Sequence, residues 1–410
     1  MSLTIRPVAA EELRSWVATL HGAFFIHADV AADAAFRARF YDMDRVLGAF
    51  DGDRAVGTYR SFAARLTVPG GGTLAADAVT AVTVAPTHRR QGALRAMMTA
   101  DLAAARERGE PVAILMASEA PIYGRFGFAP ATEHVALEID TRAVRFARPA
   151  LEADCSVEPV ESRALRAVGP AIFERTVRAE PGAIERPERR WDIDLGIVVP
   201  PANKPWQGWQ YLCRDAAGEA HGYLRYHVEE KWDCRRPANV AVIDELVAAT
   251  PAAYARLWRF ACELDLVTTV KADDRRVDEL LPWLLVDERA VRQTCRSDHL
   301  WLRILDTAAA LAARRYLRPG RLVLEVRDAG RHAAGRFLLE GGPDGADCRP
   351  TTAAADIELT VEALGSAYLG GTALARLADA GLASEATPGS LSTADAMFRS
   401  PVAPFCSTWF

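Results

Sequence analysis

The pattern of hydrophobic positions is clearest between residues 78 and 111, where a strand pattern leads into a helix pattern. Residues 78–84 are apolar or β-branched throughout, which favours a strand buried on both faces. After a polar turn, apolar residues recur at the three-to-four-residue spacing of a helix: Leu94, Met97, Met98 and Leu102. Gly109 and Pro111 end that helix. Residues 112–117 then predict the next buried strand.

The rest of the chain shows two further stretches of alternating strands and helices. Before residue 75 we expect strands at 3–6, 46–50 and 55–68 and a helix at 11–21. From 156 to about 287 the plan repeats, with strands at 210–214, 220–228 and 240–246 and a helix at 252–264. The last stretch predicts strands at 301–304, 321–327, 335–340 and 357–361, and helices at 361–369 and 371–380. The predicted domains are therefore 1–150, 151–290 and 291–410, the first ending in the charged, proline-containing stretch 142–154.

Composition and charge exclude several classes of function. A chain of 410 residues with 50% hydrophobic residues can form two or three domains with real cores. The net charge of −5 and the scattered basic residues argue against nucleic-acid binding, and favour cationic small molecules as partners. No apolar run reaches transmembrane length and no signal-peptide core is found, so we expect a cytoplasmic protein with no membrane partner. The seven cysteines and eight histidines lack the spacing of metal ligands, so no metal is expected.

The turn between residues 85 and 95 has the features of an anion-binding helix start. Free backbone N–H groups and the positive end of the helix dipole point outward there, and Gly92 lets a ligand approach the backbone. Arg89, Arg90 and Arg95 add three positive charges where the dipole favours acids. An arginine-rich first turn can also be a solvated helix end. Because charges placed against the dipole need a compensating anion, we expect an anionic cofactor at this turn.

Two sequence blocks resemble a known superfamily. Arg89-x-x-Gly92 after a strand resembles motif A of the Gcn5-related N-acetyltransferases (GNAT), although Leu94 stands where that superfamily prefers Gly or Ala. Residues 118–128, which include Tyr123-Gly-Arg-Phe-Gly-Phe, resemble the turn that completes the GNAT cofactor cleft. Together the blocks resemble the enhanced intracellular survival (Eis) branch, as do residues 300–304, 323–326 and 364–370. The resemblance implies an α/β (α+β) fold class: tandem GNAT folds with mixed central sheets, followed by a sterol-carrier-protein-like (SCP2-like) α+β domain.

The resemblance also implies that acetyl-CoA is the acetyl donor, and it implies which residues bind this cofactor. Backbone groups of Val82, Thr83 and Val84 would pair with the pantetheine arm. The pyrophosphate would lie against the helix start, formed by Arg89, Arg90, Gln91, Gly92, Ala93, Leu94 and Arg95. Ser118 and Glu119 carry over as cofactor-contacting positions, with capping of the strand end as the alternative for Glu119. At the equivalent turn of the repeat stands Ala252-Ala253-Tyr254-Ala255, so we expect the second GNAT-like domain to have lost its cofactor.

Two residues are the catalytic candidates. A phenol with a pKa near 10 suits the protonation of a thiolate leaving group, whose thiol has a pKa of roughly 8.5, and Tyr123 stands at the matching position. The alternative role for Tyr123 is a core residue of its turn. In Eis-like enzymes the main-chain carboxylate of a C-terminal Phe returns to the active site, and this chain ends in Phe410. Trp409 departs from the best-known relatives, which carry an acid there. The apolar, aromatic end of the chain predicts a docked terminus.

The acceptor side is less defined by the sequence. Aromatic and acidic residues that suit a cationic amine are Trp16, Phe24, His27, Asp29 and Asp33, each of which also fits a structural or surface position. The predicted activity is N-acetylation of an aminoglycoside, a polyamine or a lysine side chain, and the resemblance implies a homo-hexamer. Acetylation of protein N-termini or lysines rather than antibiotics is an alternative acceptor class. The alternative to an enzyme is a non-catalytic ligand- or lipid-binding scaffold with inactive GNAT domains.

Overall fold

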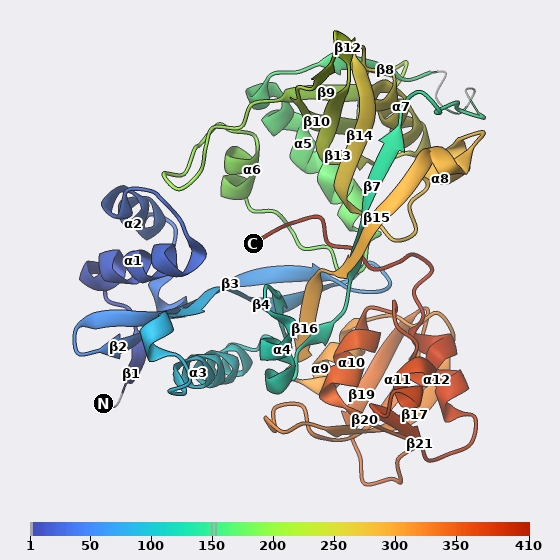
Figure 1. Cartoon of the computed structure of the whole chain (residues 1–410). Coiled ribbons are helices and arrows are strands. Elements are labelled where there is room, and N and C mark those ends of the chain that lie inside the picture. The colour runs from blue at the N-terminus through green and yellow to red at the C-terminus, as the bar shows by residue number, and fades with distance from the viewer. Residues whose placement is uncertain (1–2, 149–150, 152–153) are drawn as a thin grey trace.

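The computed structural model describes residues 3–148, 151 and 154–410, which form three units built on three main sheets (Figure 1). The first sheet has the strand order β1-β2-β3-β4-β5-β16-β6 and the second the order β15-β7-β14-β13-β10-β9-β8. The third has the order β19-β18-β17-β20-β21. Two α/β units with mixed sheets are thus followed by a smaller α+β unit, as the sequence predicts.

The first unit forms because its strands carry apolar residues on both faces. Its own strands are β1 (Thr4–Pro7), β2 (Val46–Asp51), β3 (Arg54–Thr67), β4 (Thr73–Val84), β5 (Val112–Met116) and β6 (Ala129–Pro130). Its helices are α1 (Leu13–Phe24), α2 (Val30–Ala38), α3 (Ala93–Glu107) and α4 (Ala120–Tyr123). Helix α1 packs against Phe50 and Ala55, whereas α3 packs against their chain neighbours Ala49 and Val56. Since successive side chains of a strand point to opposite faces, α1 and α3 cover opposite faces of the sheet.

The second unit repeats this plan. Its strands are β8 (Ser156–Pro159), β9 (Trp209–Arg214), β10 (Ala220–Glu229), β13 (Asn239–Ala248) and β14 (Val267–Arg275), with a small hairpin of β11 (Trp232–Asp233) and β12 (Arg236–Pro237). Its helices are α5 (Ser162–Val177), α6 (Glu188–Asp194), α7 (Pro251–Cys262) and α8 (Leu281–Leu284). Strands β13 and β14 run parallel on either side of helix α7 in sequence, as β4 and β5 do on either side of α3. The predicted repeat of the first plan is therefore present.

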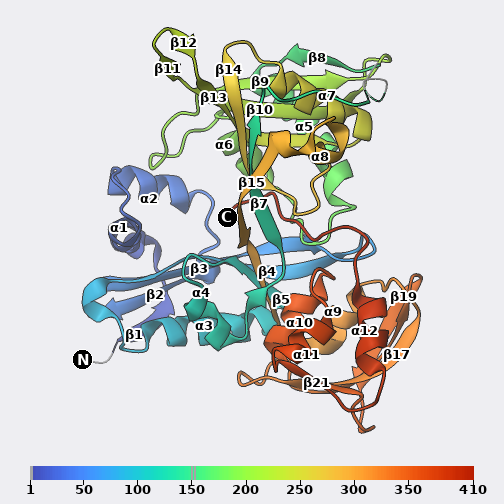
Figure 2. The ribbon, with the colours of Figure 1, turned by 45° about the vertical axis from the view of Figure 1, so that its right-hand side comes forward.

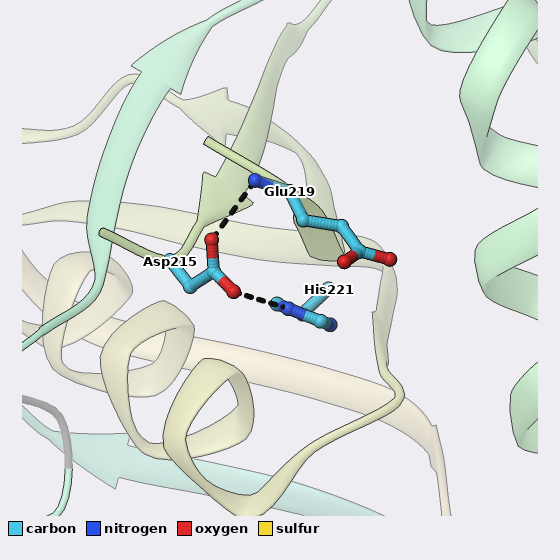
Figure 3. A group of neighbouring side chains, drawn as sticks. All are labelled: Asp215, Glu219 and His221. Atoms are coloured by element: carbon cyan, nitrogen blue, oxygen red, sulfur yellow. Dashed lines mark hydrogen bonds and ion pairs between the residues drawn. The ribbon is translucent and has the colours of Figure 1, made fainter. Parts of the chain in front are cut away.

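The hairpin of β9 and β10 turns around Gly218 and is held by Asp215, as Figure 3 shows. The Asp215 carboxylate accepts hydrogen bonds from the backbone N–H of Glu219 (2.9 Å) and of Ala217 (3.0 Å), and it lies 2.9 Å from His221 Nε2. Possible ligand atoms of Asp215, Glu219 and His221 lie within 4.8 Å of one another. The Asp215 carboxylate is already used by the turn, and Glu219 is paired with Arg175 at 3.4 Å. The turn and the ion pair with Arg175 account for the contacts of this group.

The two larger sheets exchange strands. Strand β7 (Glu133–Asp140) leaves the first unit and lies between β14 and β15 (Val291–Asp298) in the second sheet. Strand β16 (Leu300–Ile304) returns and pairs with both β5 and β6 in the first sheet. The expectation that the strand at 301–304 belongs to the last domain is therefore wrong. All five residues of β16 are buried, which suits a central strand better than an edge. The domain boundaries at residues 150 and 290 remain predictions.

The third unit packs directly against the first. Its strands are β17 (Gly320–Arg327), β18 (Gly335–Gly342), β19 (Gly345–Pro350), β20 (Ile357–Thr360) and β21 (Ala383–Glu385). Its helices are α9 (Thr307–Ala313), α10 (Val361–Tyr368), α11 (Leu374–Asp379) and α12 (Ser390–Phe398). Helix α10 lies so close to β16 that a side chain at Gly365 would meet the carbonyl oxygen of Leu302 at 2.8 Å. One apolar core therefore continues from the first sheet into the third unit.

The end of the chain is docked, as its apolar sequence predicts. Phe405, Cys406 and Thr408 are buried, and the Phe405 N–H donates to the carbonyl of Pro181 at 2.8 Å. Figures 1 and 2 show the last segment leaving the third unit, passing the second and ending between the first and second. Within the described part of the chain, no helix is both long and apolar enough to cross a membrane.

Candidate active site

Strands β4 and β5 separate halfway along β4 and leave one backbone edge open. They pair in parallel only from Ala76 with Val112 to Val79 with Leu115. Beyond that point β4 pairs with β3 alone among the described strands. Ala81 bulges out with φ 54°, and its carbonyl accepts a hydrogen bond from Thr58 Oγ1 at 2.7 Å. The N–H and C=O groups of Val82, Thr83 and Val84 thus lie on a stretch where an extended ligand can add as a strand does.

The start of α3 has free donors and unpaired positive charge. Its N-cap residue is Gly92, with φ 86°, and no side chain caps the first turn. The first turn holds no acidic residue. Within the described residues, no carboxylate is paired with Arg89, Arg90 or Arg95. This is the arrangement that the sequence predicts for an anion site.

A single cleft of about 1250 Å³ brings most of the predicted residues together. Its walls come from the end of β4, the start of α3, the segment after β5, helix α4 and the chain terminus. The predicted residues that line it are Val82, Thr83, Val84, Arg89, Arg90, Gly92, Ala93, Leu94, Arg95, Ser118, Glu119, Tyr123 and Phe410. Gln91 is exposed and lies outside the lining. The individual roles of these residues remain predictions.

Tyr123 is both a core residue and a residue of the cleft. It ends helix α4, is 9% exposed, and packs edge-on against Phe128 at 6.3 Å between ring centroids. Burial, and then the nearby charge of Glu119, raise the pKa of the Tyr123 hydroxyl. The hydroxyl therefore stays protonated at neutral pH and can donate a hydrogen bond into the cleft. The two alternatives for Tyr123, core packing and acid, are thus compatible.

Phe410 reaches the same cleft from the opposite end of the sequence. Its ring packs edge-on against Phe62 of β3, with 5.4 Å between centroids and an interplanar angle of 86°. Trp409 also lines the cleft. The structure therefore places the C-terminal residue and Tyr123 in one cavity, as the proposed acid and base require.

Sequence reasoning missed the contribution of strand β16 and of the third unit to this cleft. Arg303 is 1% exposed, and its Nη2 donates to both oxygens of Asp328 at 2.8 and 2.7 Å. A side chain at Gly127, whose φ is 81°, would meet this guanidinium at 2.8 Å. The glycine of the Phe-Gly-Phe turn thus makes room for Arg303. No spacing in the sequence connects residues 127, 303 and 328, which only the strand exchange brings together.

Most of the residues suggested for the acceptor pocket have structural roles. Trp16 is fully buried and its Nε1 donates to the Leu47 carbonyl at 2.9 Å. Asp29 caps helix α2, and buried Asp33 is paired with a histidine at 2.7 Å and an arginine at 2.8 Å. His27 is exposed and lies outside the cleft lining. Phe24, at the end of α1, lines the cleft.

The second unit lacks the corresponding anion site. Helix α7 is capped by Thr250, whose hydroxyl accepts a hydrogen bond from the Ala253 N–H at 3.2 Å. A side chain therefore already satisfies one of the donors that α3 leaves free. The first turn of α7 holds Ala252, Ala253 and Tyr254 in place of arginines. The start of α7 thus differs from that of α3, and the loss of the cofactor from this copy remains a prediction.

Comparisons with known proteins identify all three units. Residues 4–131 and residues 182–304 each match an acetyltransferase (GNAT) domain, and residues 307–407 match a sterol carrier protein domain. The predicted order of tandem GNAT folds and an SCP2-like domain is thus confirmed.

Full-length relatives agree with this assignment. An uncharacterized N-acetyltransferase of Streptomyces griseus is 42% identical over 417 residues, covering 100% of both chains. The N-acetyltransferase Eis of Mycobacterium tuberculosis is 38% identical over 366 residues, covering 87% of this chain and 86% of that protein. The crystal structure of Eis1 from Mycobacterium abscessus matches with a TM-score of 0.86 and 34% identity, over 99% of this chain and 100% of that chain. The chain therefore belongs to the Eis family of GNAT N-acetyltransferases.

Proposed function

We propose that this acetyltransferase uses acetyl-CoA to acetylate an amine of a cationic acceptor in the cleft of the first unit. The observation that carries the proposal is the meeting of three features in one cavity. These are the open edge of β4, the arginine-rich start of α3 that no side chain caps, and the presence of both Tyr123 and Phe410 in the lining. The first would bind the pantetheine of the cofactor, the second would bind its pyrophosphate, and the third would transfer the protons of the reaction.

The residues present fit acetyl-CoA. The edge from Val82 to Val84 would hold the pantetheine by backbone hydrogen bonds. The first turn of α3 would hold the pyrophosphate, and a Cβ added at Gly92 would meet no heavy atom within 4 Å, so the backbone is accessible. Arg89, Arg90 and Arg95 would balance its charge. When bound, acetyl-CoA supplies a thioester whose acetyl group passes to the amine, releasing a thiol.

The chain's own groups would then handle two protons. The acceptor amine must lose one proton to become a nucleophile, and the leaving thiolate must gain one. A main-chain carboxylate with a pKa of about 3.3 to 3.7 is too weak a base to take the proton of an alkylammonium directly, so we assign to Phe410 a relay through water. The hydroxyl of Tyr123, kept protonated by burial, would supply the proton that the leaving thiolate needs. A Val82 or Val84 amide would polarise the thioester carbonyl.

The acceptor class follows from what surrounds the reacting end of the cleft. Phe24, Trp409 and Phe410 offer aromatic faces, which attract ammonium groups. Aminoglycosides, polyamines and lysine side chains all present such groups, and this geometry does not rank them. Because relatives that span the chain are N-acetyltransferases, a non-catalytic scaffold is the weaker proposal. A hexameric assembly and a cytoplasmic location remain predictions from the family resemblance.

The proposal is tested by calorimetry and by an acceptor panel. Titration with acetyl-CoA should give one site per chain, and release of CoA thiol should identify the acceptor. Arg90→Glu should weaken acetyl-CoA binding by roughly 10- to 100-fold, because it reverses a charge beside the pyrophosphate. Arg106→Glu is the matched control, since Arg106 lies in the last turn of the same helix. Two sites per chain, or equal binding by both variants, would refute the assignment of the cofactor site.

A further inference from the structure

The second unit has a cleft at the position that corresponds to the cofactor cleft of the first. Strands β13 and β14 pair in parallel up to Ile243 with Ala272 and then separate, as β4 and β5 do after Val79. The second cleft is lined by residues 243–248 of β13, Tyr254 of α7, residues 274–276 after the separation and the end of α5. Equivalent segments line the first cleft: residues 79–84 of β4, the start of α3, the end of α1, and Met116, Ser118 and Glu119.

The end of the chain occupies this second cleft. Phe405, Ser407, Thr408 and Trp409 belong to its lining, and the remaining cavity measures only about 190 Å³. The cofactor cleft, by contrast, measures about 1250 Å³. Phe405 and Thr408 are buried there, although both belong to the last seven residues of the chain. The equivalent of a cofactor cleft is thus filled by a segment of the same polypeptide.

Polar contacts fix the segment to β14 and to the turn that follows it. The Asp278 carboxylate accepts a hydrogen bond from the Ala403 N–H at 2.8 Å. The Asp274 carboxylate accepts one from Trp409 Nε1 at 2.9 Å. In the first unit, the residues that follow the corresponding strand are Ser118 and Glu119, the predicted cofactor contacts.

Trp409 is held on a second side by two histidines. Its ring packs edge-on against His299 at 4.5 Å, and His299 stacks on His134 at 4.8 Å between centroids. His134 Nδ1 lies 2.9 Å from Asp274 Oδ1, so the Asp274 carboxylate contacts both His134 and Trp409. Burial alone would raise the pKa of Asp274, but hydrogen bonds from His134 and Trp409 lower it, so its carboxylate is ionised at neutral pH. The next residue in the chain is Phe410, which lies in the first cleft.

We propose that the second unit's cleft, in place of a cofactor, binds the chain's own C-terminal segment 403–409 and thereby positions Phe410 for the reaction. Asp274, His134 and His299 are positioning residues, since they act on Phe410 through Trp409. The proposal rests on the proposed role of the Phe410 carboxylate. It gives the degenerate domain a function in catalysis: the fold is kept because its cleft orients the end of the chain.

The experiment compares Asp274→Ala with Asp273→Ala in the full-length protein. Asp273 precedes Asp274 on β14, is exposed and lies outside the second cleft, so it controls for a change of charge on the same strand. Hydrogen exchange measured by mass spectrometry on peptides covering 403–410 reports release of the tail without reference to activity. Asp274→Ala should speed this exchange by roughly 10- to 100-fold, as expected for loss of a hydrogen bond to a charged group. Asp273→Ala should exchange as the wild type does.

Kinetics test the positioning step. Asp274→Ala should lower kcat by at least roughly 10-fold, while acetyl-CoA affinity stays within about twofold of wild type, because the residues assigned to the pantetheine and the pyrophosphate are unchanged. Trp409→Phe, which removes the indole donor and keeps an aromatic ring, should reproduce both effects in weaker form. A released tail with unchanged kcat, or a tail that stays protected in Asp274→Ala, would overturn the proposal.

A truncation separates this inference from the proposed function. Removing residues 403–410 should leave one acetyl-CoA site per chain, since α7 has no anion site. A second acetyl-CoA site in the truncated protein would show that the tail blocks a working cofactor cleft, and would refute the proposal. An inactive wild-type protein that still binds one acetyl-CoA would instead refute the proposed reaction, and hydrogen exchange would then still decide whether the second unit binds the tail.

Discussion

Two glycines at opposite ends of helix α3 allow a direct test of where acetyl-CoA binds. Gly92 precedes the helix with φ 86°, and Gly109 follows it with φ 76°. An alanine at either position would meet no heavy atom of the chain within 4 Å. The cost of Gly92→Ala and of Gly109→Ala to folding is therefore the backbone strain alone, roughly 1–2 kcal/mol each. We expect both variants to lose similar stability.

The two variants should differ in acetyl-CoA binding. Gly92 lines the cleft, whereas Gly109 lies outside its lining, so only the Cβ of Gly92→Ala enters the space assigned to the pyrophosphate. Displacing a charge-assisted hydrogen bond between phosphate and backbone costs about 1.5–3 kcal/mol. At about 1.4 kcal/mol for each tenfold change, the dissociation constant should rise roughly 10- to 150-fold in Gly92→Ala. It should stay near the wild-type value in Gly109→Ala.

Calorimetry gives the dissociation constants, and urea unfolding gives the stabilities of the same preparations. Equal affinity in the two variants would refute the reasoning, because it would mean that the cofactor does not approach the backbone at the start of α3. A large difference in stability would show instead that the two glycines do not carry the same strain, and the binding comparison would then need a different control.

Three further predictions follow from the site. Tyr123→Phe should lower kcat by roughly 10²- to 10⁴-fold with acetyl-CoA affinity unchanged, since the ring keeps its packing against Phe128 and loses only the acid. Single-turnover kinetics would measure this effect, and a near-normal rate would show that Tyr123 is only a packing residue. Adding residues after Phe410 should abolish acetylation because the carboxylate becomes an amide, whereas Phe410→Leu should cost far less; a C-terminally extended protein, intact by mass spectrometry, that works at the native rate would exclude the carboxylate. Burial, and then His134, lower the pKa of His299 to about 4 from an ordinary value of 6.5. As the pH falls, the unfolded chain therefore binds a proton at His299 before the folded chain does. The free energy of unfolding should fall between pH 6.5 and pH 4, by at most about 3 kcal/mol. Urea unfolding should show a weaker pH dependence for His299→Gln in that range, and an unchanged dependence would contradict the assignment.

The sequence predicted most of the fold because its local signals agree with its tertiary structure. Residues 78–84 are apolar or β-branched throughout and form the second half of β4, and the predicted strand ends as β4 does at Val84. The expected burial on both faces is found only for Ala78 and Val79, because Thr80–Val84 border the open cleft and are half-buried. The helix start was recognisable because Arg89 and Arg90 stand where a helix favours acids. These features are encoded within about twenty residues of one another, which is where sequence patterns are informative.

The parts that the sequence did not predict depend on contacts between distant segments. Nothing in residues 300–304 indicates that they join the first sheet, because a buried strand has the same apolar pattern in either unit. For the same reason, the sequence does not predict that Arg303 and Asp328 line the cleft. Asp29 and Asp33 were suggested for the acceptor pocket because composition alone does not distinguish a helix cap or a buried ion pair from a ligand contact.

The exchange of β7 and β16 also determines the order in which this protein can fold. The first sheet is completed only when Leu300 pairs with Met116, so during synthesis β5 has no neighbour on that side until residues 300–304 have emerged. Until then the apolar edge of β5 is open to pairing with other chains. A truncated protein that ends near residue 150 would carry β7 without its sheet and the first sheet without its strand β16. The two GNAT folds are therefore expected to unfold as one cooperative unit, and to fold only as a pair.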